Sequence, residues 1–489
     1  MASDVRTALA LSFAGKYSQY VLGLVSNIIL ARLLTPAEIG VFSVAVVIST
    51  LGHVLRDFGV SQYLVQEKEL SPQKIRAAFS VTLLVAWLVA LVLMALSGPL
   101  AAFYGSPKSA AVLRVVAFTF FIIPFGSVTL ALLRRDFRFG ALYVMTLASS
   151  VVHLVVAVGL AWVGFGSMSL AWALVANVSA TALLSIRYRP AGMQLRPTRH
   201  GLRDVIHFGG LISAGSLLGT FNQGLPELII GKMLGMSSVA FYSKAMVPGS
   251  LFSQFMMNAI GPVILPALAQ KVRAGDYREP FLRSVAYLTG FTYPFFVFVA
   301  LMAAPMVRLL FGPQWDAAIE PTRILSLAAA LWSTVTLVPS LLIAMGKPRP
   351  QFTVTAQLLP LRLGAVLLAS AYSLEAACGA ILCCTLVAIG LYFSQLRQYG
   401  GIGSVLVLRT AARSLIVTLV ANLGPACLLL WPGLISQGVW ITLLLAAGLA
   451  AAGWLIGLFL FRHPLVEELK KLYQHRGAWR LARVRKLGA

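Results

Sequence analysis

The stretch LARLLTPAEIGVFSVA (residues 30–45) returns in altered form 200 positions later as IGKMLGMSSVAFYSKA (residues 230–245). Each copy starts at the end of an apolar run with a base, Arg32 or Lys232, and passes through a short break. A β-branched residue, a small residue, an aromatic and a serine then lead into a second apolar run. The similarity indicates two hydrophobic helices joined by a tight turn, occurring twice in the chain.

A second pair of segments follows in the same order. Residues 99–116 (PLAAFYGSPKSAAVLRVV) and 306–325 (MVRLLFGPQWDAAIEPTRIL) both contain an aromatic–glycine pair, a short polar link, Ala-Ala and an arginine that opens a helix. Two matched segments in the same order predict a duplicated unit of about six helices, a plan that recurs among membrane transporters.

The composition identifies a membrane protein. Hydrophobic residues make up 59% of the 489 residues, charged residues only 11%, and the mean hydropathy is +0.86. A soluble core this apolar would leave too little polar surface to cover it. We therefore predict an all-α polytopic membrane protein with about fourteen spans of about 20 residues, the length that crosses ~30 Å of hydrocarbon. The predicted spans are 11–31, 39–56, 77–97, 112–133, 140–162, 168–186, 205–230, 238–265, 282–304, 322–345, 352–372, 375–395, 410–430 and 438–461.

Topology explains the net charge of +24 better than nucleic-acid binding does. With a cytoplasmic N-terminus, most Lys and Arg residues fall in or beside cytoplasmic segments, which is the positive-inside bias of membrane proteins. The bias predicts an even number of spans with both termini in the cytoplasm. These bases would also contact anionic membrane lipids.

The spans group into regions along the chain. Residues 1–186 and 205–395 form a predicted N-terminal and C-terminal lobe of six spans each, joined by a basic cytoplasmic linker, 187–204. Residues 396–461 add two accessory spans. The tail 462–489 has apolar residues at helical spacing among bases, which predicts a helix lying on the anionic inner leaflet.

A short helix is also expected between the second and third spans. Residues 60–76 mix charges with apolar side chains, a pattern typical of an interfacial helix.

The sequence contains no catalytic or cofactor signature. There is no glycine-rich phosphate loop, no HExxH, no Ser/His/Asp set and no carboxylate pair facing a common site. The four cysteines lie in apolar runs without CxxC spacing, so neither a disulfide nor a metal site is predicted. We predict that the protein is not an enzyme and has no cofactor.

Basic residues inside the spans are the main candidates for function. A charged side chain at the centre of a membrane helix costs about 2.5–3.5 kcal/mol, so it usually faces a polar cavity or a partner. Lys16, Lys244 and Arg362 lie within spans and Arg56 at a span end, and their charge would favour an anionic substrate such as a pyrophosphate. Lys16 and Lys244 could instead snorkel to the membrane surface, whereas Arg362 lies midway along its span.

Other polar residues carry less specific expectations. Arg32 and Lys232 occupy matching places at the predicted outer mouth, where they could anchor to lipid. Glu227 could serve ion coupling or pair with Lys232. His53 and His153 could titrate near neutral pH, or pack as hydrogen-bonded residues.

Several segments resemble bacterial polysaccharide-transport flippases. They are LARLLTPAEIGVFSVAVVI, LRDFGVSQYLVQEKELS, VAFYSKAMVPGSLF, LLFGPQW and RHPLVEELKK. The resemblance covers essentially the whole chain. It points to the multidrug/oligosaccharidyl-lipid/polysaccharide exporter superfamily, particularly members that serve exopolysaccharides such as colanic acid. It implies a MATE-like fold of two six-helix lobes plus two C-terminal helices.

The resemblance also implies a function. Such proteins move undecaprenyl-pyrophosphate-linked oligosaccharide repeat units from the cytoplasmic to the periplasmic leaflet of the bacterial inner membrane by alternating access. They serve exopolysaccharide or O-antigen biosynthesis beside the polymerase and export machinery of the pathway. Basic residues in a central cavity bind the diphosphate-sugar head. By position this role falls to Lys16, Arg56 and Lys244, and depth adds Arg362.

Three other functions stay open. A cation-coupled multidrug exporter of the same fold needs an essential acid in the N-terminal lobe, and the nearest acids, Asp57 and Glu38, lie at membrane boundaries. A sugar polymerase or ligase needs a large external loop with catalytic arginines, whereas the external loops here are short. A non-transporting scaffold would need no charge at mid-membrane.

Overall fold

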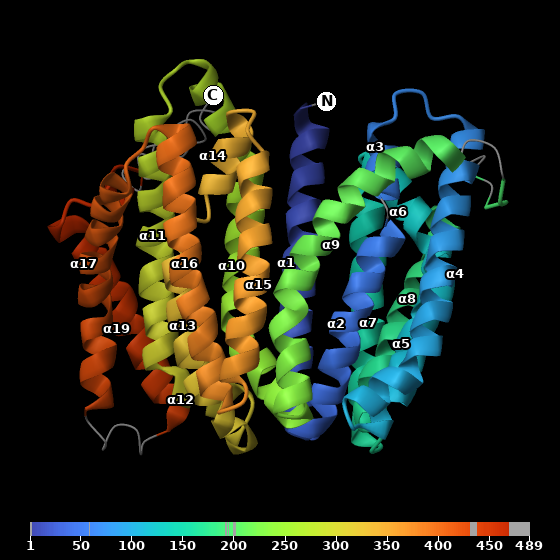
Figure 1. Ribbon diagram of the computed structural model, residues 1–489, viewed down its shortest axis with the longest axis horizontal. Helices are drawn as coiled ribbons and strands as arrows, with labels where there is room; N and C mark the ends of the chain where they lie inside the picture. Colours follow the sequence, from blue (N-terminus) through green and yellow to red (C-terminus); the bar gives the residue numbers. More distant parts are fainter. Residues whose placement is uncertain are drawn as a thin grey trace, which may run out of the picture. The chain divides into compact units, whose positions relative to one another are not determined.

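The computed structural model describes the chain apart from residues 1, 58, 191–192, 194, 199–201, 431–437 and 469–489. The side chains of 2–13, 202–215 and 257–263 are also outside the description. Every regular element in the described part is a helix (Figure 1). The predicted all-α architecture is therefore confirmed.

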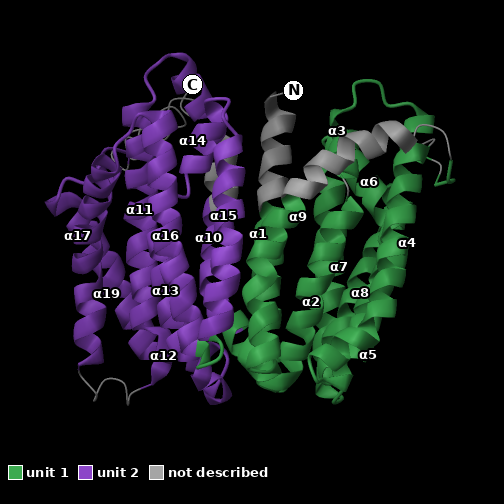
Figure 2. Cartoon of the chain, viewed as in Figure 1, with its two compact units in different colours: residues 1–243, 370–374 green, residues 244–369, 375–489 purple. Residues whose placement is uncertain are grey.

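The chain forms two compact units, residues 1–243 with 370–374 and residues 244–369 with 375–489 (Figure 2). The helices of the first unit are α1 (Ala2–Leu33), α2 (Pro36–Asp57), α3 (Val60–Gln66), α4 (Pro72–Phe103), α5 (Pro107–Ile122), α6 (Pro124–Arg135), α7 (Phe139–Trp162), α8 (Ser167–Tyr188), α9 (Leu202–Met233) and the start of α10 (Met236–Arg273). The rest of α10 belongs to the second unit with α11 (Arg278–Leu301), α12 (Ala303–Leu310), the 3₁₀ helix η1 (Pro313–Ala318), α13 (Ile319–Ser333), α14 (Val338–Ala344), α15 (Arg349–Ala369), α16 (Leu374–Gly400), α17 (Ser404–Leu429) and α19 (Val439–Leu460).

Many of these helices are long and apolar enough to cross a membrane. Among the described residues there are ten such helical stretches, or eleven if the bent pair α5–α6 forms one span. The long helices α1, α9 and α10 contain residues outside the description and are not among the ten. The protein is thus a multi-pass membrane protein, and the count of fourteen spans remains a prediction.

One predicted span is sharply bent in the structure. The segment 112–133 is bent by 53° between α5 and α6. Pro124, the first residue of α6, has no N–H to continue the hydrogen bonds of α5, which is a common cause of such a bend. The predicted span 322–345 matches the stretch Pro313–Ala344, which is long and apolar enough to be one span, although turns separate α13, ending at Ser333, from α14, starting at Val338.

The two copies of the repeated segment pack against each other within the first unit. A Cβ atom on Gly40 would lie 1.7 Å from the carbonyl oxygen of Met236, so only glycine permits this approach of α2 to the start of α10. A Cβ on Gly231 would lie 3.2 Å from Val44 Cγ2, again between the two copies. The aromatic–glycine pairs of the second repeat also match, since Gly105 and Gly312 both follow a helix end with positive φ, 62° and 102°.

The described residues of the segment predicted as a linker, 187–204, pack along α4 and α6. The Thr198 N–H donates to Ser80 Oγ at 2.7 Å, and Arg76 Nε donates to the carbonyl of Arg196 at 3.2 Å. Met193 is buried beside Thr129. Helix α9 follows this segment in the chain and belongs to the first unit. The division of the chain into two lobes at 187–204 stays a prediction.

The short helix expected in 60–76 is α3, but its environment differs from the prediction. Val60, Tyr63 and Leu64 are buried in a cluster with α4 and α6. The apolar side of α3 therefore packs into the protein core and not against lipid.

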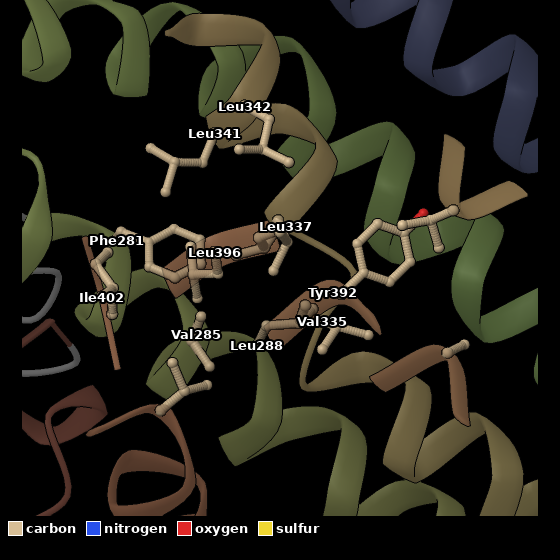
Figure 3. Close-up of a cluster of buried hydrophobic side chains, with 14 of the residues drawn as sticks. Phe281, Val285, Leu288, Val335, Leu337, Leu341, Leu342, Tyr392, Leu396 and Ile402 are labelled. Carbon is tan, nitrogen blue, oxygen red and sulfur yellow. The ribbon is translucent and has the colours of Figure 1, made fainter. Parts of the chain in front are cut away.

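The core of the second unit gathers aliphatic and aromatic side chains from α10, α11 and α14–α17 (Figure 3). Phe281 and Val285 of α11 lie beside Leu337, Leu341 and neighbouring residues that precede or form α14 (Figure 3). Tyr392 and Leu396 of α16 complete the cluster, and all are nearly inaccessible to solvent.

Helix α11 is joined to its neighbours by side chains that satisfy its irregular backbone. Pro294 has no N–H to bond the carbonyl of Gly290, four residues earlier. The indole N–H of Trp454 in α19 donates to that carbonyl at 2.8 Å, and Asn422 of α17 donates to the carbonyl of Pro294 at 3.3 Å. The carbonyl that Pro294 leaves open thus ties α19 to α11, and the Asn422 bond ties α17 to the same region.

The predicted accessory pair corresponds to α17 and α19, which pack closely on each other. A Cβ on Gly453 would lie 2.7 Å from the carbonyl oxygen of Val420, and one on Gly457 would lie 3.3 Å from Val417 Cα. Two glycines four residues apart let the helix backbones approach, as in GxxxG packing in membranes.

The start of the tail differs from the prediction. Leu465 and Val466 are buried in a cluster with α17 and α19, so they face protein and not the lipid surface. The Leu465 N–H donates to His463 Nδ1, which leaves the ring proton on Nε2, 3.1 Å from Ser414 Oγ. Ser414 in turn lies 2.8 Å from Thr289 Oγ1 of α11. The remainder of the predicted tail helix lies outside the described residues.

Candidate functional site

A cavity of about 610 Å³ lies within the first unit. Its walls come from the second half of α2, from α3, α6 and α8, and from Ser216 of α9. The polar side chains that line it are Thr50, His53, Arg56, Asp57, Ser61, Gln62, Ser127, Arg134, Asn177, Thr181 and Ser216. The cavity therefore combines charged, amide and hydroxyl groups inside a membrane-embedded bundle.

Arg56 is the most buried charge in this cavity. Its side chain is 15% exposed, and its buried Nε has no hydrogen-bond partner in the described part of the chain. Asp57 Oδ1 lies 4.0 Å from Arg56 Nη1, at the limit of an ion pair. A buried guanidinium with an open donor can bind an anion without first breaking a strong contact.

The two groups next to Arg56 are already engaged. Asp57 accepts a hydrogen bond from Ser61 Oγ at 2.9 Å, and this bond spans the start of α3. The His53 ring lies 4.6 Å from the ring of Phe120, tilted by 31°. Both residues line the cavity, with His53 held against α5 by this aromatic contact.

Arg134 and Arg135 end α6 but have different surroundings. Arg134 lines the cavity. Arg135 points to the end of α3, where Nη1 donates to the carbonyls of Leu64 and Glu67 at 2.8 and 2.6 Å. Arg135 thereby holds α3, one wall of the cavity, in place.

The sequence analysis did not identify Arg134. Gly126, Leu130 and Arg134 all line the cavity and are spaced four residues apart, so they share one face of α6. This spacing indicates that Arg134, rather than Arg135, lies on the same face of α6 as Gly126 and Leu130.

The other predicted basic residues lie elsewhere. Lys16 is exposed on α1 and does not line the cavity. Lys244, in the second unit, is 5% exposed, with Nζ 5.0 Å from the Phe311 ring centroid and 5.2 Å from that of Trp315. Arg362 is half-buried in α15, and its buried Nε has no hydrogen-bond partner among the described atoms. The structure brings Arg56 and His53 together in the cavity of the first unit, whereas Lys244 and Arg362 belong to the second unit.

Of the remaining predicted residues, Lys232 has a structural contact. Lys232 Nζ donates to the carbonyl of Phe103 at 2.5 Å and lies 4.5 Å from that ring, so it caps α4. No ion pair joins Lys232 to Glu227 among the described residues, and Glu227 is half-buried in α9. Arg32 is exposed at the end of α1, and His153 is half-buried in α7.

Comparison with known proteins agrees with this architecture. A family model described as polysaccharide biosynthesis protein matches residues 29–320, more than half of the chain. The succinoglycan biosynthesis transport protein ExoT of Rhizobium meliloti is 27% identical over 337 residues, which cover 68% of this chain and 67% of that protein. The lipopolysaccharide biosynthesis protein WzxC of Escherichia coli is 24% identical, with 67% of each chain covered.

Solved structures share the fold. The lipid II flippase MurJ in an inward-closed conformation has a TM-score of 0.74 at 11% identity, covering 94% of this chain and 100% of MurJ. An inward-facing multidrug resistance MATE family transporter has a TM-score of 0.60 at 16% identity, covering 78% of this chain and 94% of that one. The predicted MATE-like fold is confirmed. With the family model matching most of the first unit and part of the second, the chain belongs to the polysaccharide biosynthesis protein family.

Proposed function

We propose that this protein is a flippase for lipid-linked oligosaccharides. It would move undecaprenyl-pyrophosphate-linked repeat units from the cytoplasmic to the periplasmic leaflet of the bacterial inner membrane by alternating access. Both termini would lie in the cytoplasm, and the repeat units would supply exopolysaccharide or O-antigen biosynthesis. The relatives named for succinoglycan transport and lipopolysaccharide biosynthesis support this class of substrate.

The cavity with Arg56 is the observation that carries the proposal. A diphosphate needs cationic donors, and Arg56 and Arg134 supply two guanidinium groups in one cavity. Charge-assisted bonds to phosphate are about twice as strong as neutral ones, and binding would satisfy the open Nε of Arg56. The polyprenyl chain would remain in the bilayer, where it keeps its apolar surroundings.

Neutral polar groups in the same cavity suit the sugar part. Asn177 and Thr181 of α8 and Gln62 of α3 present amide and hydroxyl groups beside the arginines. Such groups bind sugar hydroxyls by ordinary hydrogen bonds. The cavity lining thus offers charged groups for the diphosphate and uncharged groups for the first sugars.

A cation-coupled multidrug exporter is the second candidate, favoured by the acid Asp57 in the cavity. That acid is hydrogen-bonded to Ser61 and adjoins Arg56, which offsets its charge. Glu38 is engaged as well, because it accepts hydrogen bonds from the N–H and Oγ1 of Thr35 at 2.9 Å in a helix-capping arrangement. The acids that a cationic drug would need are therefore occupied, and the excess of base favours an anionic substrate.

The test starts from cells that lack this protein but keep polymer synthesis otherwise intact. Mass spectrometry of lipid extracts would identify the undecaprenyl-pyrophosphate oligosaccharide, and a periplasmic glycosidase or lectin would report its leaflet. We expect a complete repeat unit held on the inner leaflet. Units that reach the outer leaflet as usual would rule out the flippase and favour the drug exporter.

Point variants connect this test to the cavity. We expect Arg56→Gln and Arg134→Gln to lower export at least tenfold at normal protein abundance. The matched control is Arg323→Gln, since Arg323 is paired with Glu320 in the second unit and lines neither described cavity. Normal export by the Arg56→Gln/Arg134→Gln double variant would remove both residues from the site.

A further inference from the structure

The turn between α6 and α7 has an unusual backbone for its sequence. Phe137 has φ 54°, a left-handed conformation that glycine adopts far more readily than residues with a Cβ. The Phe137 N–H donates to the carbonyl of Arg134, and the Arg138 N–H to that of Leu133. This is the Schellman ending of a helix, with phenylalanine where glycine is usual.

The phenylalanine gains little from the protein itself. Its side chain is 70% exposed, and its aromatic contact is an edge-to-face one with Phe139, whose ring centroid is 6.0 Å away. A strained position that holds a large apolar side chain outside the protein points to a contact with something else.

Charge surrounds this exposed ring. Arg134 and Arg138 are exposed on either side of it and form no ion pair with a described carboxylate. Asp136 is also exposed in the turn, and Arg135 is engaged with α3. The turn therefore has a net excess of positive charge around one apolar side chain.

We propose that the α6–α7 turn is a binding site for the headgroup of an anionic phospholipid. Phe137 inserts below the headgroups, and Arg138 binds the lipid phosphate. The turn connects two membrane-embedded segments, and α7 is itself long and apolar enough to span, so the surface that the ring meets is the bilayer boundary. Charge complementarity selects an anionic lipid over a zwitterionic one.

The opposite end of α7 supports this depth. Trp162 and Phe165 are 83% and 51% exposed at the α7–α8 turn. Helix α7 has 24 residues and so is about 36 Å long, which separates these rings from Phe137 by roughly the hydrocarbon thickness plus its boundaries. Aromatic side chains at both ends are typical of the two membrane–water interfaces.

The test uses the purified full-length protein in nanodiscs of phosphatidylcholine alone or mixed with phosphatidylglycerol. We expect phosphatidylglycerol to raise the unfolding midpoint of the wild type. Phe137→Gly and Arg138→Gln should each lose at least half of that rise. Native mass spectrometry measures the ratio of phosphatidylglycerol to phosphatidylcholine that stays bound to the protein. We expect this ratio to be at least threefold lower for Arg138→Gln than for the wild type.

Arg462 provides a matched control. It also has a left-handed backbone, φ 47°, and ends α19 with the same hydrogen-bond pattern. Arg462→Gly relieves the same strain and removes a base, yet it should keep the full effect of phosphatidylglycerol. In detergent, Phe137→Gly and Arg462→Gly should both be at least as stable as the wild type.

The proposal fails if Phe137→Gly and Arg138→Gln keep the full stabilisation by phosphatidylglycerol and the wild-type lipid ratio. It also fails if Arg462→Gly loses as much as they do, because the effect would then be one of overall charge. Lipid retention by Arg138→Gln keeps the proposal testable even if the Phe137 variant does not fold.

Discussion

Arg134 and Arg135 are neighbours in sequence, but only Arg135 is tied to the backbone of another helix. Its Nη1 donates to the carbonyls of Leu64, Val65 and Glu67 at the end of α3, and its Nη2 to that of Lys68 at 3.3 Å. Bonds to a charged donor contribute about 1.5–3 kcal/mol, so Arg135→Ala should lower the free energy of unfolding by about 2 kcal/mol. Arg134→Ala should change it by less than about 0.5 kcal/mol.

Thermal unfolding in detergent measures both variants side by side. Equal destabilisation by Arg134→Ala and Arg135→Ala would contradict the division of roles. Because removal of Arg135 releases one wall of the cavity, its variant should also lose export, whereas Arg134→Ala should lose export at normal stability.

At this scale the sequence identifies residue types but not their surroundings. As a base within a span, Lys244 is predicted either to face a cavity or to snorkel to the membrane surface. Phe311 and Trp315, which enclose it, are more than sixty positions away, and nothing in the sequence brings them to it. Arg56 could be predicted to reach the cavity because its position at a span end allows a hydrated environment.

At the scale of elements, Trp454 compensates a defect that proline creates in α11. Trp454→Phe keeps the aromatic contact with Phe291 but leaves the carbonyl of Gly290 without its donor. An unsatisfied buried carbonyl costs about 1–3 kcal/mol, so the unfolding midpoint should fall. The control is Trp440→Phe, because Trp440 is 66% exposed on α19 and its substitution should have no measurable effect.

His463 gives the junction of α11, α17 and α19 a predictable pH dependence. Burial, and then the charge of Arg413, lowers the pKa of His463 from its ordinary value of 6.5 to about 4. The unfolded chain therefore binds a proton below pH 6.5 while the folded protein does not until about pH 4. Stability should be complete above pH 6.5 and decrease by on the order of 2 kcal/mol as the pH falls towards 4.

The comparison that isolates this residue is His463→Gln. The difference in unfolding midpoint between the two proteins should shrink as the pH falls from 7.5 to 4.5. A difference that stays constant would show that His463 titrates at its ordinary pKa in the folded protein.

Element boundaries followed from the sequence where local chemistry decides them. The breaks at residues 33–36 and 233–236 were predicted because both apolar runs are interrupted there. The bend at Pro124 was not predicted, because the apolar run continues on both sides of it. Hydropathy shows that a segment is apolar but not that the helix axis changes direction. The burial of α3 and of Leu465 was also missed, because an amphipathic pattern predicts an apolar face without telling whether lipid or protein covers it.

For the whole molecule, composition alone was enough to predict a multi-pass helical membrane protein. The fold could be anticipated from the repeat, because two equivalent halves constrain how many helices each contributes. The contact between the two repeated segments, where Gly40 meets Met236, could not be predicted from the sequence. It depends on how the helices pack.

The membrane topology can be tested by the accessibility of two exposed residues, Lys108 and Asp276. The expected result depends on whether the bent pair α5–α6 crosses the membrane once. Between Lys108 and Asp276 lie α5–α6, α7, α8, α9 and α10, so if the bent pair is one span, five crossings put these exposed residues on opposite sides of the membrane. The positive-inside bias predicts that Asp276 lies in the cytoplasm. In a variant with all four cysteines replaced, a membrane-impermeant maleimide applied to intact cells should label Lys108→Cys but reach Asp276→Cys only after permeabilisation. If α5–α6 instead enters and leaves on one side, four crossings remain and both cysteines would react alike. A reversed pattern, with only Asp276→Cys labelled from outside, would invert the orientation and with it the direction of the proposed transport.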